Sequence, residues 1–120
     1  MRKIIFASII LSLLFVCNNV ATAQAASKPM KGKVVSLDDV IKGHKDLQLT
    51  KERANELLER GSPLVFLFNK KIYFVQNDDG SFAFRQLANY AHNKNVGIVG
   101  KTRTVNGINV IVMSKIESMD

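Results

Sequence analysis

The chain has 120 residues, of which 17 are basic and 10 acidic, and its formal net charge is +7. This length supports one hydrophobic core and excludes an arrangement of several domains. With one cysteine and two histidines, the chain lacks the residues for a disulfide framework or a cysteine-rich zinc site.

Residues 1–26 have the features of a secretory signal peptide. Arg2 and Lys3 give a positively charged start, an apolar run covers residues 4–16, and small residues dominate 21–26. The apolar run is too short for a transmembrane helix, which needs roughly 20 residues. We therefore expect an exported protein, periplasmic or secreted. The candidate cleavage positions follow Ala23, Ala25 or Ala26.

Cys17 lies inside the predicted signal peptide, so cleavage would leave a mature chain without cysteine. Processing as a lipoprotein at Cys17 is disfavoured, because the bulky Val16 precedes it where a small residue is usual. We expect residues 27–120 to form a single domain without a transmembrane segment. Removal of Arg2 and Lys3 leaves 15 basic against 10 acidic residues. This balance permits binding to an anionic polymer or lipid surface, although solubility alone also explains it.

The mature chain is expected to begin with a short polar segment, residues 27–31, which one predicted strand follows. The apolar residues between 34 and 41 indicate this strand, and Asp38 and Asp39 are expected to bend or end it. Residues 42–46 are polar and contain a glycine, which is typical of a loop.

A helix is predicted to begin after Thr50, whose hydroxyl can cap the free N–H groups of the first turn. Leu49 and Ala54 occupy the two positions of a hydrophobic staple. Gly61 and Pro63 follow the helix as the residues that end it.

The next segment predicts a hairpin and a second helix. Residues 64–68 and 72–75 are rich in β-branched and aromatic side chains, and the polar residues 69–71 separate them. A turn is expected at 77–80. Apolar residues at helical spacing then predict a helix over 82–92.

The last segment predicts a second hairpin, with strands at 96–105 and 108–113. Asn106 and Gly107 between them suit a type I′ turn, which requires positive φ at both positions. Gly97 and Gly100 within the first strand suggest a bend or bulge. The turn fixes three cross-strand pairs: Val105 with Ile108, Thr102 with Ile111, and Gly100 with Met113.

Five strands with a helix between the third and fourth are the order of an OB-fold, a small Greek-key barrel. In its strand and turn patterns the chain resembles a family of small exported bacterial OB-like domains, most of them without an assigned function. The resemblance covers about residues 31–117 and implies a mainly β fold with two helices and a five-stranded, partly open barrel. The segments that carry it are 61–67, 71–75, 87–88, 96–101, 105–112 and 115–117.

Metal binding and catalysis have little support in the sequence. His44 and His92 are far apart and belong to no metal-binding motif. Some members of the family carry cysteines around the first helix, but this chain has none there, so a metal or redox role does not transfer. Asp38 and Asp39 are adjacent, and adjacent residues of a strand point to opposite faces. We expect no metal, no cofactor and no enzymatic activity.

The sequence therefore favours an exported binding or interaction module. Its partner would be a small ligand, a polymer or an envelope protein, and nucleic acid is not expected outside the cytoplasm. Fold-level analogy with OB barrels nominates four ligand-binding residues: Lys70, Tyr73, Lys101 and Arg103.

Two alternative functions stay open. One is a periplasmic metal-binding protein. The other is a binder of polyanions or single-stranded nucleic acid, which would stack bases on aromatic side chains along a basic face. The second alternative is disfavoured because a domain without tryptophan needs its phenylalanines to fill the core. The residues that could form the basic and aromatic face are Phe66, Phe68, Phe74, Lys71 and the four nominated above.

Overall fold

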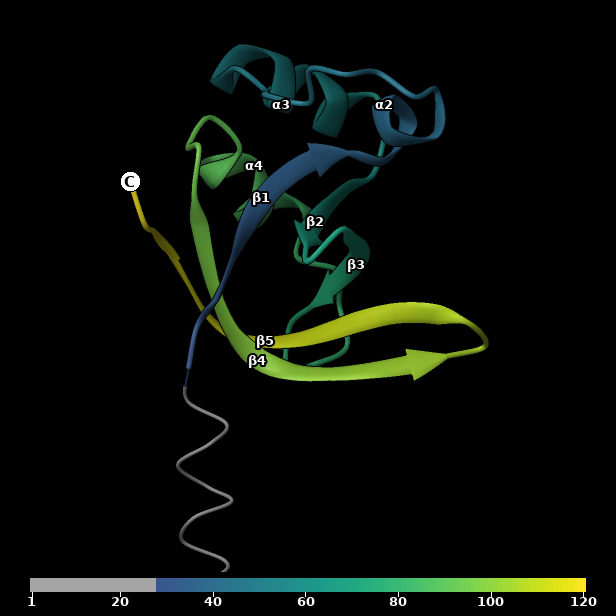
Figure 1. Ribbon diagram of the computed structural model, residues 1–120, viewed down its shortest axis with the longest axis vertical. Helices are drawn as coiled ribbons and strands as arrows, with labels where there is room; N and C mark the ends of the chain where they lie inside the picture. Colours follow the sequence, from purple (N-terminus) through teal and green to yellow (C-terminus); the bar gives the residue numbers. More distant parts are fainter. Residues whose placement is uncertain (1–27) are drawn as a thin grey trace, which may run out of the picture.

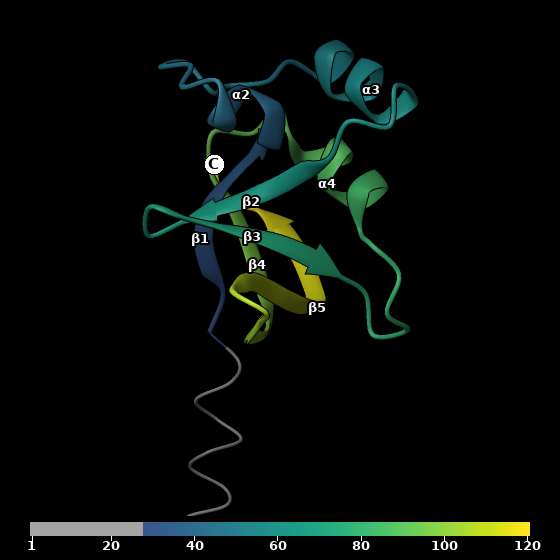
Figure 2. The same cartoon turned by 90° about the vertical axis from the view of Figure 1, so that its right-hand side faces the viewer.

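Five strands close into a barrel in the computed structural model, which describes residues 28–120 (Figures 1 and 2). The predicted signal peptide, Cys17 and the cleavage positions lie outside the described residues. The strands are β1 (Met30–Ser36), β2 (Leu64–Phe68), β3 (Lys71–Gln76), β4 (Val96–Val105) and β5 (Ile108–Ser118).

The strand order around the barrel is β1-β2-β3-β5-β4, and β1 also pairs with β4. All pairings are antiparallel except that of β3 with β5, which is parallel. With α4 (Phe84–Tyr90) between β3 and β4, this is the connectivity of an OB-fold. The predicted mainly β, OB-like barrel is thus confirmed, and the sheet is closed where a partly open barrel was expected.

The core fills the barrel with side chains from alternate strand positions, because successive residues of a strand point to opposite faces. The helix α3 (Lys51–Glu59) packs on α4, and both lie over one end of the barrel (Figure 1). The largest side chains without exposed surface in this core are Val34, Leu64, Phe66, Val75, Leu87, Val96, Ile98 and Ile111.

The predicted ends of α3 are confirmed. The Thr50 hydroxyl accepts a hydrogen bond from the Arg53 N–H at 3.1 Å. Leu49 and Ala54, the staple residues, are both buried in the core. Gly61 has a φ of 73° and its N–H donates to the carbonyl of Leu58, which satisfies one of the last carbonyls of the helix.

The first predicted strand is confirmed only as far as Ser36, and its expected continuation toward residue 41 is wrong. β1 ends at Ser36, and a short helix, α2, follows at Leu37–Ile41. The Ser36 hydroxyl accepts from the N–H of Asp39 and so caps α2. Asp38 and Asp39 lie in its first turn, where the helix dipole favours acidic side chains. The capping pattern therefore outweighs the β-propensity of the apolar residues.

The second predicted helix begins later than expected. Phe82 pairs with Gln76 as an isolated bridge beside β3, and α4 starts only at Phe84. The N–H of Ala83 donates to the carbonyl of Val75 at 2.9 Å. Ala83 is therefore the N-cap of α4: its N–H bonds to the sheet, while its carbonyl accepts the first helical bond, from Leu87 at 2.9 Å.

Both hairpins have two-residue turns with positive φ. In the β2–β3 turn, Asn69 and Lys70 have φ values of 51° and 63°, and Lys71 belongs to β3 rather than to the turn. In the β4–β5 turn, Asn106 and Gly107 have φ values of 51° and 82°. This confirms the predicted type I′ turn and its three cross-strand pairs.

A bulge interrupts the β4–β5 ladder, as the glycines predict. Gly100 pairs with Met113, whereas Val99 pairs with Lys115, so Ser114 is the extra residue. The Ser114 hydroxyl donates to the carbonyl of Val99 at 3.1 Å and holds the bulge.

We predict that Gly100→Ala lowers the free energy of unfolding by about 1–3 kcal/mol, the usual cost of overpacking. The new methyl group would overlap the carbonyl oxygen of Val112 and lie 3.0 Å from Cα of Met113. Urea unfolding measures the change. Thr102→Ala is the control, because Thr102 is exposed on the same strand, and it should cost less than about 1 kcal/mol. Equal stability of the two variants would contradict the packing at the bulge.

Candidate functional site

The outer half of the β4–β5 hairpin projects beyond the barrel. β4 pairs with β1 only through Val96, Gly97 and Ile98, and β5 pairs with β3 only through residues 110–112. All residues from 101 to 108 are exposed, and the hairpin extends well to the right of the other strands in Figure 1. We call residues 101–109 the arm.

One face of the arm looks across at the outer surface of β3. Arg103 pairs with Val110, which in turn is the register partner of Phe74 on β3. Alternation along the strands places Val105 and Ile108, themselves a cross-strand pair, on this same face. In Figure 2 the arm points toward the viewer, below β2 and β3 and opposite α2 and α3.

A groove of about 340 Å³ lies between the arm and β3. Its walls are mostly apolar, and three of its side chains are large hydrophobics with high exposure: Phe82 at 51%, Val105 at 44% and Ile108 at 51%. These exposures show that the groove is open to solvent. The complete lining is Phe74, Gln76, Phe82, Arg103, Val105, Asn106, Ile108 and Val110.

Aromatic rings form the β3 side of this groove. The rings of Phe74 and Phe82 meet edge to face, with centroids 6.1 Å apart, and Phe82 stacks on Phe84 at 5.2 Å with an interplanar angle of 3°. Such pairs contribute roughly 0.5–1.5 kcal/mol beyond their area burial. The bridge between Phe82 and Gln76 holds the backbone of the middle ring against β3.

A polar loop before Phe82 fixes the position of this ring. The carboxylate of Asp79 accepts from the Ser81 hydroxyl at 2.6 Å and from the Ser81 N–H at 3.0 Å. The side chain of Asn77 donates to the same hydroxyl at 3.1 Å and accepts from Gln86 of α4 at 3.1 Å. The hydrogen bonds from Ser81 lower the pKa of Asp79 below its ordinary value of 3.8.

Arg103 is the charged member of the groove. Its Nη2 donates to Oε1 of Gln76 at 3.1 Å, which links the arm to the end of β3. Lys101 lies two residues earlier on the same strand face and lines an adjoining hollow with Asp78 and Val112. The two cations therefore have different surroundings, although they belong to one strand.

The four residues nominated from the sequence have different surroundings. Arg103 lines the groove and Lys101 the adjoining hollow. Tyr73 packs on the hydrophobic core, with its ring 6.3 Å from that of Phe68. Lys70 lies in the turn of the other hairpin.

Sequence reasoning missed the apolar side chains of the groove. Phe82 was assigned to a helix, while Val105 and Ile108 were noted only as residues beside a turn. The usable signal was length: the predicted strands of the second hairpin are longer than those of the first, so their outer ends have no neighbouring strand to cover them.

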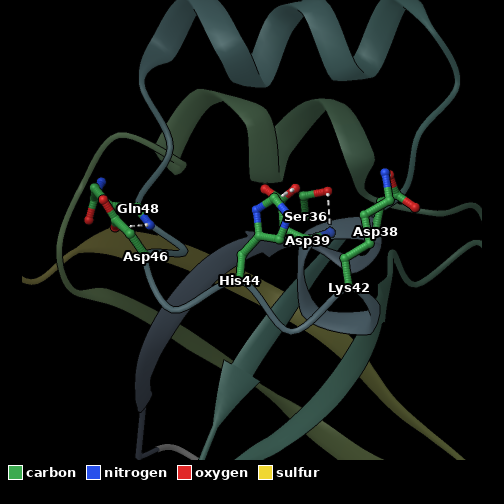
Figure 3. Close-up of polar contacts among 7 residues, drawn as sticks. All are labelled: Ser36, Asp38, Asp39, Lys42, His44, Asp46 and Gln48. Carbon is green, nitrogen blue, oxygen red and sulfur yellow. Dashed lines mark hydrogen bonds and ion pairs between the residues drawn. The ribbon is translucent and has the colours of Figure 1, made fainter.

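A second polar cluster surrounds α2 (Figure 3). Nδ1 of His44 lies 3.9 Å from Oδ1 of Asp39, and Lys42 pairs with Asp38 at 3.1 Å. Serine, histidine and aspartate together are the residue types of a hydrolytic triad. Within the described part of the chain, however, no hydrogen bond joins Ser36 to His44, and the Ser36 hydroxyl caps α2. This cluster therefore stabilises the start of the segment between β1 and β2.

Metal binding was tested against the positions of the possible ligands. Within residues 28–120, no group of three or more His, Cys, Asp or Glu side chains is placed to hold a metal ion. His92 lies two residues beyond α4, and its carbonyl accepts from the Gln48 side chain at 3.1 Å. In the same range, no helix is long and apolar enough to cross a membrane.

The chain was compared with known protein families, curated proteins and solved structures, and none of them matches. The resemblance to exported OB-like domains therefore stays an expectation. The geometry of the groove is therefore the basis on which a function can be proposed.

We predict that Asp79→Asn lowers the melting temperature at pH 7 relative to the unchanged protein. A pKa lowered by folding stabilises the folded state above the unfolded value of 3.8, and this contribution is lost as the pH falls through the folded pKa. The difference in melting temperature should therefore disappear in acid.

Asp78→Asn is the matched control, since Asp78 is the exposed neighbour and forms no side-chain hydrogen bond within residues 28–120. Melting curves between pH 2 and pH 7 measure both variants. If Asp78→Asn and Asp79→Asn behave alike at pH 7, the loop does not depend on the bonds to Ser81.

Proposed function

We propose that the protein is an exported binding module that holds a small ligand in the groove between the arm and β3. The observation that carries the proposal is the gathering of Phe82, Val105 and Ile108 around one concavity. Single exposed hydrophobic residues are ordinary on a protein surface, whereas gathered ones mark a site of interaction.

The size and chemistry of the groove support a small ligand. Its volume of about 340 Å³ lies at the lower end of the roughly 300–1,000 Å³ that ligand sites have. Such sites combine an apolar wall with a few polar groups that orient the ligand. Here Gln76, Asn106 and Arg103 are the polar groups of the lining.

Binding has more support than catalysis at this position. The groove lining contains no histidine, carboxylate, hydroxyl or thiol. A general acid or base must lie within hydrogen-bonding distance of the proton that it transfers, and a nucleophile needs a base beside it. We therefore assign no chemical step to the groove.

The polyanion alternative has less support. It requires aromatic faces beside cations along one surface, but Tyr73 and Phe68 pack against the hydrophobic core, and Phe66 is completely buried. Lys70 lies in a different hairpin from Lys101 and Arg103. A small ligand in the groove would instead contact Phe74 and Phe82, which line an open surface.

We predict that the protein binds N-phenyl-1-naphthylamine, a neutral fluorescent probe of apolar sites, and that Phe82→Ala weakens this binding about tenfold. That factor corresponds to about 1.4 kcal/mol, which is reasonable for the loss of a half-exposed aromatic wall. A fluorescence titration gives the dissociation constants.

Ile41→Ala is the control for this titration. Among residues 28–120, Ile41 is the most exposed of the large hydrophobic residues, at 73%, but it belongs to α2 and not to the groove. Its replacement should leave the dissociation constant unchanged. Absence of probe binding, or an equal effect of both variants, would refute the groove as the site.

A further inference from the structure

We infer that the ligand of the groove is an amphipathic organic anion, with an apolar body against Phe82 and an acidic group against Arg103. This inference rests on the proposed function and adds the charge of the ligand to it. The groove lining contains one cationic side chain and no acidic one. Charge complementarity therefore favours a negatively charged ligand over a neutral or positive one.

Arg103 has no carboxylate partner within the described part of the chain. The ion pairs there involve other basic residues, namely Lys42, His44, Arg53, Arg60 and Lys115. A guanidinium group has five N–H donors, and the bond to Gln76 at 3.1 Å uses one of them. The remaining donors are available to a carboxylate or a similar oxyanion, which arginine can bind through two parallel hydrogen bonds.

Gln76 orients the guanidinium group before a ligand arrives. Its Oε1 accepts from Nη2 of Arg103, and its backbone is held by the bridge to Phe82. A flexible arginine loses conformational entropy when it binds, and a hydrogen bond made in advance reduces that loss. The same glutamine thus connects the cation to the aromatic wall of the groove.

Arg103 is exposed, so the proposed ion pair depends on apolar neighbours and on the ligand itself to exclude water. Arg103 lies between Val105 on its own strand face and Val110 across the ladder, and Val110 is 7% exposed. Bound apolar atoms would remove further water from the guanidinium group, and the attraction between two charges grows as water is excluded. An exposed surface ion pair, by contrast, contributes little.

The test compares two probes that share an anilinonaphthalene skeleton. One is 1-anilinonaphthalene-8-sulfonate, which carries a negative charge, and the other is the neutral N-phenyl-1-naphthylamine. We expect the anionic probe to bind the unchanged protein at least about fivefold more tightly. In Arg103→Gln, this preference should disappear, while binding of the neutral probe should change less than twofold.

Lys101→Gln is the matched control, because it removes one positive charge from the same face of the same strand but outside the groove. It should retain the preference for the anionic probe. An equal loss in Lys101→Gln and Arg103→Gln would overturn the inference, because it would indicate attraction to overall charge.

Further outcomes separate this inference from the proposed function. If Phe82→Ala weakens the neutral probe but Arg103→Gln leaves the anion preference intact, the groove stands as a site and the anion assignment is overturned. If neither probe binds, both are overturned. If sedimentation shows a dimer that Phe82→Ala dissociates, a second copy of the chain fills the groove and the small anion is refuted.

Discussion

The antiparallel pairing of β4 with β5 is the interaction on which both the barrel and the groove depend. Its inner part joins the two ends of the sheet, because β4 pairs with β1 through residues 96–98 and β5 pairs with β3 through residues 110–112. Its outer part projects as the arm (Figure 1). The register set by the turn places Arg103 beside Val110, which lies beside Phe74, and the bulge shifts this register by one residue for the inner part. A slip by one residue would turn every side chain of the arm to the opposite face.

The bulge at Gly100 separates these two parts of the hairpin. Bulges bend a strand and increase its twist, and they frequently occur beside functional sites. Here the extra residue, Ser114, lies where β4 leaves the barrel, and its hydroxyl bonds to Val99. No side chain fits at position 100, because the carbonyl of Val112 occupies that space. The direction of the arm, and hence the shape of the groove, follows from this local packing.

The sequence was informative where a local pattern determines the structure. The Asn106–Gly107 turn fixed its cross-strand pairs, and Thr50 with Gly61 marked the ends of α3, because these effects act within a few residues. The same local logic could have found α2, since Ser36 caps it. The position of Phe82 was not accessible in this way. Its backbone forms a bridge with Gln76, and the N–H of the next residue, Ala83, donates to Val75. The helical spacing of the apolar residues does not reveal these tertiary contacts.

The candidate site was predicted least well, because exposure is decided by what lies next to a residue in space. Arg103 and Tyr73 were nominated on the same grounds, yet one lines the groove and the other packs on the core. A phenylalanine in a small domain is usually a core residue, and Phe66 is completely buried. Phe82 differs because, in the part of the chain that the structure describes, every strand belongs to the barrel itself and none covers the outer surface of β3 beside the arm. Strand length, rather than residue type, indicated which part of the sheet would stay uncovered.

The most direct test of the account is the register of the long hairpin, read from nuclear Overhauser contacts between backbone protons of facing residues. We expect Val99 to face Lys115, and Phe74 to lie beside Val110 as parallel neighbours. A hairpin that continues from its turn without a bulge would instead place Val99 opposite Ser114. That pattern, or the absence of contacts between β3 and β5, would contradict both the closed barrel and the groove beside it.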